Sequence, residues 1–261
     1  MLEKIKNMDS RKRILLVCYA VIAVCLVVLA VYGAKWIKQR NNIKEVQKIA
    51  KVEEEGNEKL DFAKLQEINP DIYAWIYIPG TKVNYPVLQS SKEEEEDYYL
   101  DHNLDGSDGR PGCIYTQKRN SKDFSDPNTV IYGHNMKDGS MFRDLHEYKD
   151  EEFFKENPYI YIYTSDRNYT YQIFAAYRYD NRYILEEYDD FKNSQAFENY
   201  LTEILSQENS ICNIDKNVAV TSEDRIVTLS TCIGNSDYRY LVQGKLIKSE
   251  EAENTTKTVQ E

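Results

Sequence analysis

Hydrophobic and polar positions divide the chain into three parts. Residues 14–34 contain no charged side chain, residues 35–69 are mostly polar, and from residue 71 onward short runs rich in Tyr, Ile and Val alternate with turn residues. A helix needs about 20 apolar residues to cross the hydrocarbon core of a bilayer, and the first part supplies 21. The pattern therefore predicts one membrane-spanning helix, a helical linker and a β-rich domain.

The apolar run at residues 14–34 is typical of an uncleaved membrane anchor. A cleaved signal peptide is the closest alternative, but its apolar region usually has only about 7–15 residues. The denser basic cluster, Arg11–Arg13, precedes the run. The positive-inside rule therefore predicts that residues 1–13 are cytoplasmic and that residues 35–261 lie outside the cell.

Residues 35–69 form the linker, and their apolar side chains recur at helical spacing. They fall into two sets: Ile43, Val46 and Ile49, and then Phe62, Leu65 and Ile68. This spacing predicts two amphipathic helices with a break near Gly56.

The third part, residues 70–248, is expected to be a single β domain followed by a polar tail at 249–261. Eight segments have the composition of strands: 72–78, 83–88, 113–117, 129–134, 158–164, 168–178, 225–231 and 238–247. Eight short strands in one domain predict a mostly antiparallel barrel or sandwich.

One helix is predicted within the β domain, over residues 190–207 between the sixth and seventh strands, with Asn193 or Ser194 as its N-cap. Its apolar face consists of Phe197, Tyr200, Leu201, Ile204 and Leu205.

Charge excludes one class of partner and gives no sign of a metal. The net charge is −11, and residues 1–40 are basic, so the remainder is more acidic still. Such a surface repels phosphate backbones, and nucleic acid is not expected as a partner. The acidic run at residues 93–97 has no glycine-punctuated ligand spacing, so we expect a solvated loop, no bound metal and no cofactor.

Three of the five cysteines lie outside the apolar run, and their contexts differ. Cys113 and Cys212 have apolar neighbours, as buried cysteines often do. Cys232 ends a predicted strand and precedes a short polar loop, and Arg239 begins the next strand. A cation beside a thiol favours the thiolate, which is the nucleophilic form. Cys232 is therefore the candidate nucleophile.

A cysteine that cleaves an amide also needs an acid for the leaving amine, and histidine is the usual choice. His134 ends a predicted strand, whereas His102 and His146 lie in strongly polar stretches and are predicted to be surface residues. Cys232, His134 and Arg239 together suggest a catalytic site. A membrane-anchored binding module in which Cys232 is structural remains an alternative from these residues alone.

Several motifs resemble those of class B sortases. TLSTC at 228–232, with Arg239 in YRYLVQGKLI, is similar to the cysteine hairpin of sortases, and IYGHNMKDGSMF at 131–142 resembles the histidine segment of class B. FAKLQEINPDIYAWIYIPGTKVNYPVLQ at 62–89 resembles the first part of that class's barrel. The resemblance covers about residues 60–248. It implies a closed eight-stranded sortase-type β-barrel with N-terminal helices and a helix inserted between strands 6 and 7, preceded by one transmembrane helix.

The resemblance also implies a reaction, cysteine transpeptidation at the surface of a Gram-positive-type bacterium. Cys232 would attack the carbonyl of a threonine in a C-terminal sorting signal and form a thioacyl enzyme. His134 would donate a proton to the departing amine and later accept one from the incoming amine. Arg239 would hold the substrate or stabilise the oxyanion, where a fixed cation acts without reorganisation.

The resemblance implies substrate-binding residues and partners as well. Ser230 matches a position lining the peptide groove, the backbone N–H of Thr231 is a candidate for the oxyanion hole, and Tyr183 and Ile184 match further groove residues. The partners would be a surface protein carrying the sorting signal and an amine of a peptidoglycan precursor.

The chain departs from the family pattern between Cys232 and Arg239. Only six residues separate the two, and Ile233 stands where an acidic residue can occur. The preferred signal, NPQTN-like or P-x-T-G-like, therefore stays open. A pilin-polymerising sortase using a lysine amine and a plain cysteine protease are alternative enzymes.

Overall fold

The computed structural model describes residues 9–50, 60–92, 95–207, 211–234 and 237–252. The chain divides into two compact units, Met1–Asn42 and Ile43–Glu261, and each is described by itself. In the first unit, helix α2 (Ser10–Ala50) begins at Ser10, and its segment 14–34 is exposed and long and apolar enough to cross a membrane.

The first predicted linker helix is the C-terminal part of α2. Helix α2 continues past residue 34 to Ala50, and Ile43, Val46 and Ala50 extend its helical spacing and have partners in the second unit. A second helix, α3 (Phe62–Ile68), is present as predicted. The predicted break near Gly56 lies outside the described residues.

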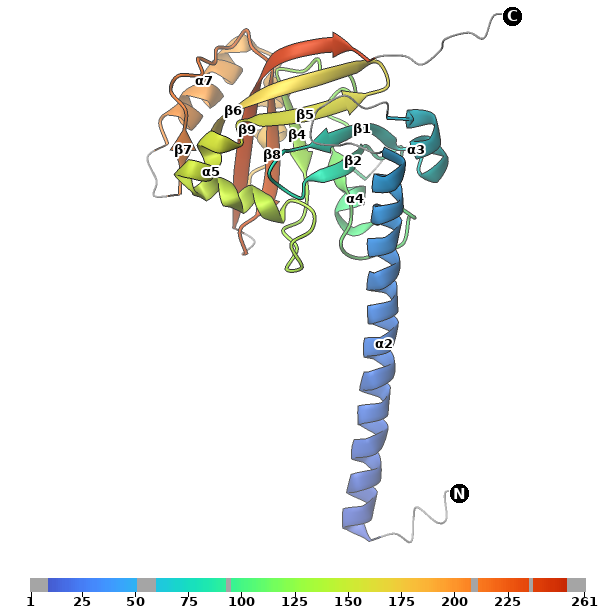
Figure 1. Ribbon diagram of the computed structural model, residues 1–261. Coiled ribbons are helices and arrows are strands. Elements are labelled where there is room, and N and C mark those ends of the chain that lie inside the picture. The colour runs from blue at the N-terminus through green and yellow to red at the C-terminus, as the bar shows by residue number, and fades with distance from the viewer. Residues whose placement is uncertain (1–8, 51–59, 93–94, 208–210, 235–236, 253–261) are drawn as a thin grey trace, which may run out of the picture. The chain divides into compact units, whose positions relative to one another are not determined.

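The second unit is a closed β-barrel, which confirms the predicted architecture (Figure 1). Its eight strands follow one another in the order β5-β1-β2-β3-β4-β8-β9-β6, and β6 pairs back onto β5. Their bounds are β1 (Ile72–Tyr77), β2 (Asn84–Leu88), β3 (Ile114–Thr116), β4 (Asn128–Tyr132), β5 (Tyr159–Thr164), β6 (Arg167–Asp180), β8 (Ile226–Cys232) and β9 (Tyr238–Glu251). The pairs β2–β3 and β4–β8 are parallel and the others antiparallel. A two-residue strand, β7 (Asn213–Ile214), adds to β6.

Strand β1 shows why the flanking helices are amphipathic. All six of its residues are buried, although successive side chains point to opposite faces of a strand. Ala74 and Ile76 face the barrel core, whereas Trp75 packs on the outer face in a cluster that includes Val46 of α2 and Leu65 of α3. The two helices thus cover strand surface that water would otherwise contact.

The inserted helix covers another part of the barrel. Helix α7 (Ser194–Leu205) begins as predicted, with the Asn193 side chain accepting a hydrogen bond from the Ala196 N–H at 2.7 Å. Its face, with Phe197 and Tyr200, packs in one cluster with β6 residues. Leu205, at the helix end, is exposed rather than part of that face.

Short helices fill the remaining connections: α4 (Tyr98–Asp101), η1 (Arg143–Lys149), α5 (Glu151–Glu156), α6 (Ile184–Glu187) and η2 (Asp189–Phe191). Strand β9 runs to Glu251, so the barrel continues past the predicted boundary at residue 248. Strand β4 ends at Tyr132, and His134 therefore lies two residues beyond the strand rather than at its end.

Candidate active site

Cys232 is the last residue of β8 and is partly buried. In the antiparallel pairing of β8 with β9, Cys232 lies directly opposite Arg239. Side chains directly opposite each other in such a pair share one face, with their Cβ atoms about 4.5–5.5 Å apart. The six-residue connection thus places Arg239 opposite Cys232 on the neighbouring strand.

His134 reaches the same end of the barrel through the parallel pairing of β4 with β8. Tyr132 pairs with Ser230, and the Gly133 N–H donates to the Ser230 carbonyl at 3.1 Å, so His134 follows at the level of Cys232. Only glycine fits at position 133, because a Cβ there would lie 2.4 Å from the Ile114 side chain.

The His134 ring is held by a segment distant in sequence. Its Nε2 lies 2.8 Å from the carbonyl oxygen of Leu100 in α4. Because a carbonyl can only accept, Nε2 carries the hydrogen. Burial lowers the pKa of His134, which favours the neutral ring.

His146 contradicts its prediction as a surface residue. It is only 8% exposed, and its Nε2 lies 3.0 Å from the backbone oxygen of Cys232. The Asn135 side-chain amide donates to the same oxygen at 2.9 Å. Burial lowers the pKa of His146 to about 4. The stretch DLHEYKD looks polar in sequence, but the tight turn of η1 buries Leu145, His146 and Tyr148.

Comparisons with known proteins identify the family of this chain. Residues 76–247 match the family described as Sortase domain. Two curated relatives are Sortase B of Listeria monocytogenes, 40% identical over 195 residues (74% of this chain and 76% of the relative), and Sortase B of Staphylococcus aureus, 35% identical over 192 residues (72% and 75%).

This chain belongs to the class B sortases.

Solved structures support the same assignment. Sortase B from Bacillus anthracis in complex with AAEK1 has a TM-score of 0.69 and 34% identity, covering 83% of this chain and 99% of that one. A Staphylococcus aureus sortase B–substrate complex has a TM-score of 0.69 and 30% identity, covering 82% and 99%. As a member of this family, the chain is a cysteine transpeptidase.

The remaining cysteines of the sortase barrel have a different environment from Cys232. Cys113 is buried with its Sγ 3.6 Å from the His102 carbonyl, and Cys212 is half-buried. Burial raises the pKa of both thiols, which keeps them protonated at neutral pH.

The substrate-binding residues expected from the sequence occupy different depths. Ser230 and Thr231 are buried in β8, and the Thr231 hydroxyl has no hydrogen-bond partner among the residues that the structure describes. Tyr183 is 44% exposed, whereas Ile184 is buried in the cluster between the barrel and α7. Tyr183 therefore presents its side chain at the surface of the sortase, and Ile184 anchors the same segment.

Asp97 corrects the expectation that the acidic run is only a solvated loop. Its carboxylate accepts hydrogen bonds from the hydroxyls of Tyr115 at 3.0 Å and Tyr183 at 2.7 Å, and from the Gln117 side chain at 2.8 Å. Asp97 thus joins β3 to the Tyr183 segment. Glu93 and Glu94 lie outside the described residues. Over the described part of the chain, no cluster of three His, Cys, Asp or Glu side chains could hold a metal ion.

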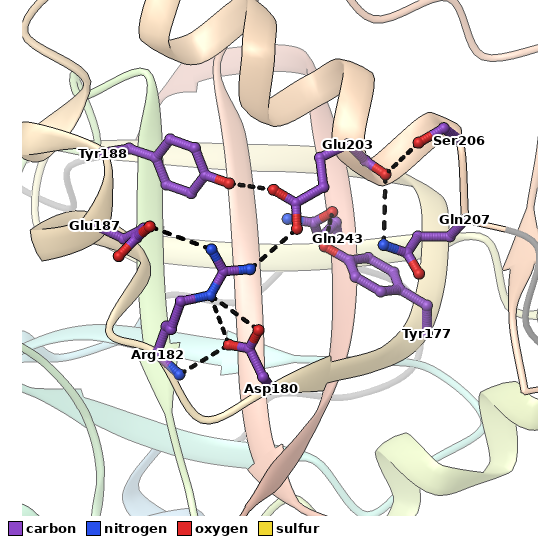
Figure 2. Close-up of polar contacts among 9 residues, drawn as sticks. All are labelled: Tyr177, Asp180, Arg182, Glu187, Tyr188, Glu203, Ser206, Gln207 and Gln243. Atoms are coloured by element: carbon purple, nitrogen blue, oxygen red, sulfur yellow. Dashed lines mark hydrogen bonds and ion pairs between the residues drawn. The ribbon is translucent and has the colours of Figure 1, made fainter.

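Arg182 fixes the segment that carries Tyr183 and Ile184. Its guanidinium contacts three carboxylates: Asp180 at 2.8 Å, Glu187 at 3.3 Å and Glu203 of α7 at 3.1 Å (Figure 2). The Glu203 carboxylate also accepts a hydrogen bond from Tyr188 (Figure 2). These bonds tie the turn after β6 to the inserted helix.

Replacing Arg182 by glutamine should destabilise the sortase by about 1 kcal/mol or more, because three carboxylates would then face one another without their shared cation. Thermal unfolding of the full-length enzyme in detergent micelles measures the loss. Arg143→Gln is the matched control, since Arg143 has one exposed partner, Glu147 at 3.6 Å, and should change stability little. Equal midpoints for the two variants would contradict a structural role for the Arg182 cluster.

The low pKa of His146 predicts an acid-sensitive contribution to stability. The unfolded chain binds a proton at this residue below about pH 6.5, whereas the folded enzyme binds it only near pH 4. The unfolded state therefore holds more protons between these values, so this contribution is complete above about pH 6.5 and is lost as the pH falls towards 4.

The variant His146→Gln tests this prediction, because glutamine does not titrate. We expect its unfolding midpoint to fall less steeply than that of the wild type between pH 6.5 and 4.5. Parallel curves for the two proteins would show that His146 titrates normally in the folded state.

Proposed function

We propose that this sortase is a membrane-anchored transpeptidase that cleaves a C-terminal sorting signal after threonine and transfers the protein to an amine of peptidoglycan. The observation that carries the proposal is the meeting of Cys232, Arg239 and His134 at the ends of β8, β9 and β4. The Staphylococcus aureus sortase B structure is a complex with substrate, which supports a substrate-binding site in this related chain.

Cys232 is the nucleophile of this reaction. The Cys232 thiol passes its proton to Nδ1 of His134, and the resulting thiolate attacks the threonine carbonyl and moves an electron pair onto the oxygen. The carbonyl then re-forms, the amide bond breaks, and the amine departs with the proton from His134. The result is a thioester between Cys232 and threonine. An incoming amine then gives a proton to His134 and attacks the thioester, which forms a new amide and releases the thiolate.

His134 suits the proton transfer better than His146. The Nε2 of His134 donates to the Leu100 carbonyl, which leaves Nδ1 as the nitrogen that exchanges a proton with the substrate. The Nε2 of His146 instead faces the Cys232 carbonyl, and the pKa of about 4 keeps that ring neutral at physiological pH.

Arg239 is proposed to stabilise the oxyanion or hold the peptide next to Tyr183. Its positive charge reaches both neighbouring tyrosines. It opposes the burial that raises the pKa of Tyr132, and it opposes the Asp97 hydrogen bond that raises the pKa of Tyr183 to about 12. The rings of Tyr132 and Tyr183 lie 6.4 Å apart. These two aromatic rings support a peptide groove that leads to Cys232. Ser230, Thr231 and Ile184 are the other residues proposed to line this groove.

The proposed location is the outer face of a cell membrane, with residues 1–13 inside. The apolar segment of α2 and the basic cluster Arg11–Arg13 support this orientation. The surface of a Gram-positive bacterium is the expected site, in keeping with the relatives from Listeria and Staphylococcus.

The test is intact mass spectrometry of the full-length enzyme in detergent micelles with NPQTN-like and P-x-T-G-like peptides. A mass gain equal to the peptide up to its threonine identifies both the acyl-enzyme and the signal. Adding a peptidoglycan-type amine or a lysine-containing pilin peptide then shows which amine removes the adduct. Release by water as fast as by either amine would indicate a protease and contradict the proposal.

A further inference from the structure

The Cys232 carbonyl lies where the parallel ladder between β4 and β8 stops. Carbonyls two residues apart along a strand point to the same edge, so the Cys232 oxygen faces the same side as the Ser230 oxygen, which accepts from Gly133. In an unbroken parallel ladder, the backbone N–H of Asn135 would be the next donor. The chain has turned away by then, because β4 ends at Tyr132 and Asn135 pairs with Met141 instead.

Two side chains replace the missing ladder bond. The Asn135 amide and the His146 Nε2 lie 2.9 and 3.0 Å from the Cys232 oxygen. A carbonyl oxygen has two lone pairs and can accept from both side chains, and the Asn135 amide nitrogen also lies 3.0 Å from His146 Nε2. With Nε2 carrying the hydrogen, the buried Nδ1 of His146, which has no partner among the described residues, has no hydrogen to donate. The His146 ring also packs on Tyr240 of β9, with ring centroids 5.2 Å apart.

We propose that Asn135 and His146 are positioning residues for Cys232. On one edge, β8 is held at this residue by its pairing with Arg239. On the other edge, the two side-chain donors fix the direction of the carbonyl and therefore the backbone torsion that aims the thiol. The proposal rests on the proposed role of Cys232 as nucleophile.

This positioning controls the rate of the chemical step rather than peptide binding. A displacement of about 1 Å at a reacting atom can cost about a hundredfold in rate. The peptide is held elsewhere, by the proposed groove at Tyr183 and Arg239. Loss of a donor should therefore lower kcat and leave KM nearly unchanged.

Three variants of the full-length enzyme test the proposal with a sorting-signal peptide. His146→Phe keeps a ring on Tyr240 and removes the donor, His146→Gln keeps a donor, and Asn135→Leu is nearly isosteric without one. We expect His146→Phe and Asn135→Leu to lower kcat by about tenfold to a hundredfold, with KM within about twofold of wild type. His146→Gln should keep kcat within about threefold, which a role as proton donor would not allow.

Alkylation of Cys232 by iodoacetamide and thermal unfolding, measured on the same samples, show that each variant is folded with a reactive thiol. A wild-type kcat in both His146→Phe and Asn135→Leu would overturn the proposal. An equal loss in His146→Gln and His146→Phe would also overturn it, because the donor would then be irrelevant. If one variant does not fold, the comparison of the others with wild type decides. The Cys232→Ala variant tests the proposed function separately. If Cys232 were not the nucleophile, this variant would retain activity.

Discussion

Replacing Cys232 by alanine is expected to eliminate the acyl-enzyme and to lower transpeptidation by about a thousandfold or more, because the thioester has no other atom on which to form. Intact mass spectrometry and product formation with the preferred sorting-signal peptide measure both effects. The fold should remain, since Cys232 is partly exposed at the end of its strand and makes no contribution to the main core.

Cys212→Ala is the matched control, because this thiol is also half-buried and its Sγ lies 3.7 Å from the Gln207 carbonyl. It should acylate at the wild-type rate. In the wild-type enzyme, iodoacetamide should modify Cys232 faster than Cys113 or Cys212, whose pKa values are raised by burial. Equal alkylation of all three, or an adduct that persists in Cys232→Ala, would contradict the assignment of the nucleophile.

Replacing His134 by glutamine is expected to lower kcat/KM by about a hundredfold to ten-thousandfold. Glutamine can still donate to the Leu100 carbonyl, but it cannot pass a proton to the leaving amine. The measurement is steady-state transpeptidation, with thermal unfolding of the variant as a check on its fold.

Comparison of His134→Gln with His146→Gln distinguishes the proton donor from the positioning residue. Glutamine at position 146 keeps the hydrogen bond to the Cys232 carbonyl, so that variant should remain active while His134→Gln is inactive. His102→Gln is a further control, because the His102 ring is bound by Asp108 at 3.1 Å and stacks on Tyr98. Inactivity of His146→Gln or His102→Gln, together with activity of His134→Gln, would show that the acid was wrongly assigned.

Much of the fold is local enough to be predicted from the sequence. Strands such as β1 and β8 are short β-branched and aromatic runs between turn residues, so their composition alone indicates them. The Asn193 cap and the apolar face of α7 are likewise properties of neighbouring residues. The choice between a barrel and a sandwich was not local. It came from the resemblance to sortases and is confirmed by the pairing of β6 with β5.

The errors occurred where an element's surroundings override its own composition. Asp97 belongs to an acidic run in sequence but finds three donors on other segments. His146 lies among charged neighbours and is nevertheless buried beneath the end of β8.

The sequence by itself determined the apolar segment, the order of the strands along the chain, and the cysteine, histidine and arginine motifs that indicate the family. Only the tertiary structure decided which residues meet at Cys232. Asn135 and His146 are 97 and 86 residues away from it, and Leu100 is 34 residues from His134. The physical reason is that the parallel pairing of β4 with β8 brings their ends together. The hydrogen bond that this ladder leaves unmade there is completed by side chains that are distant in sequence, so no local pattern indicates them.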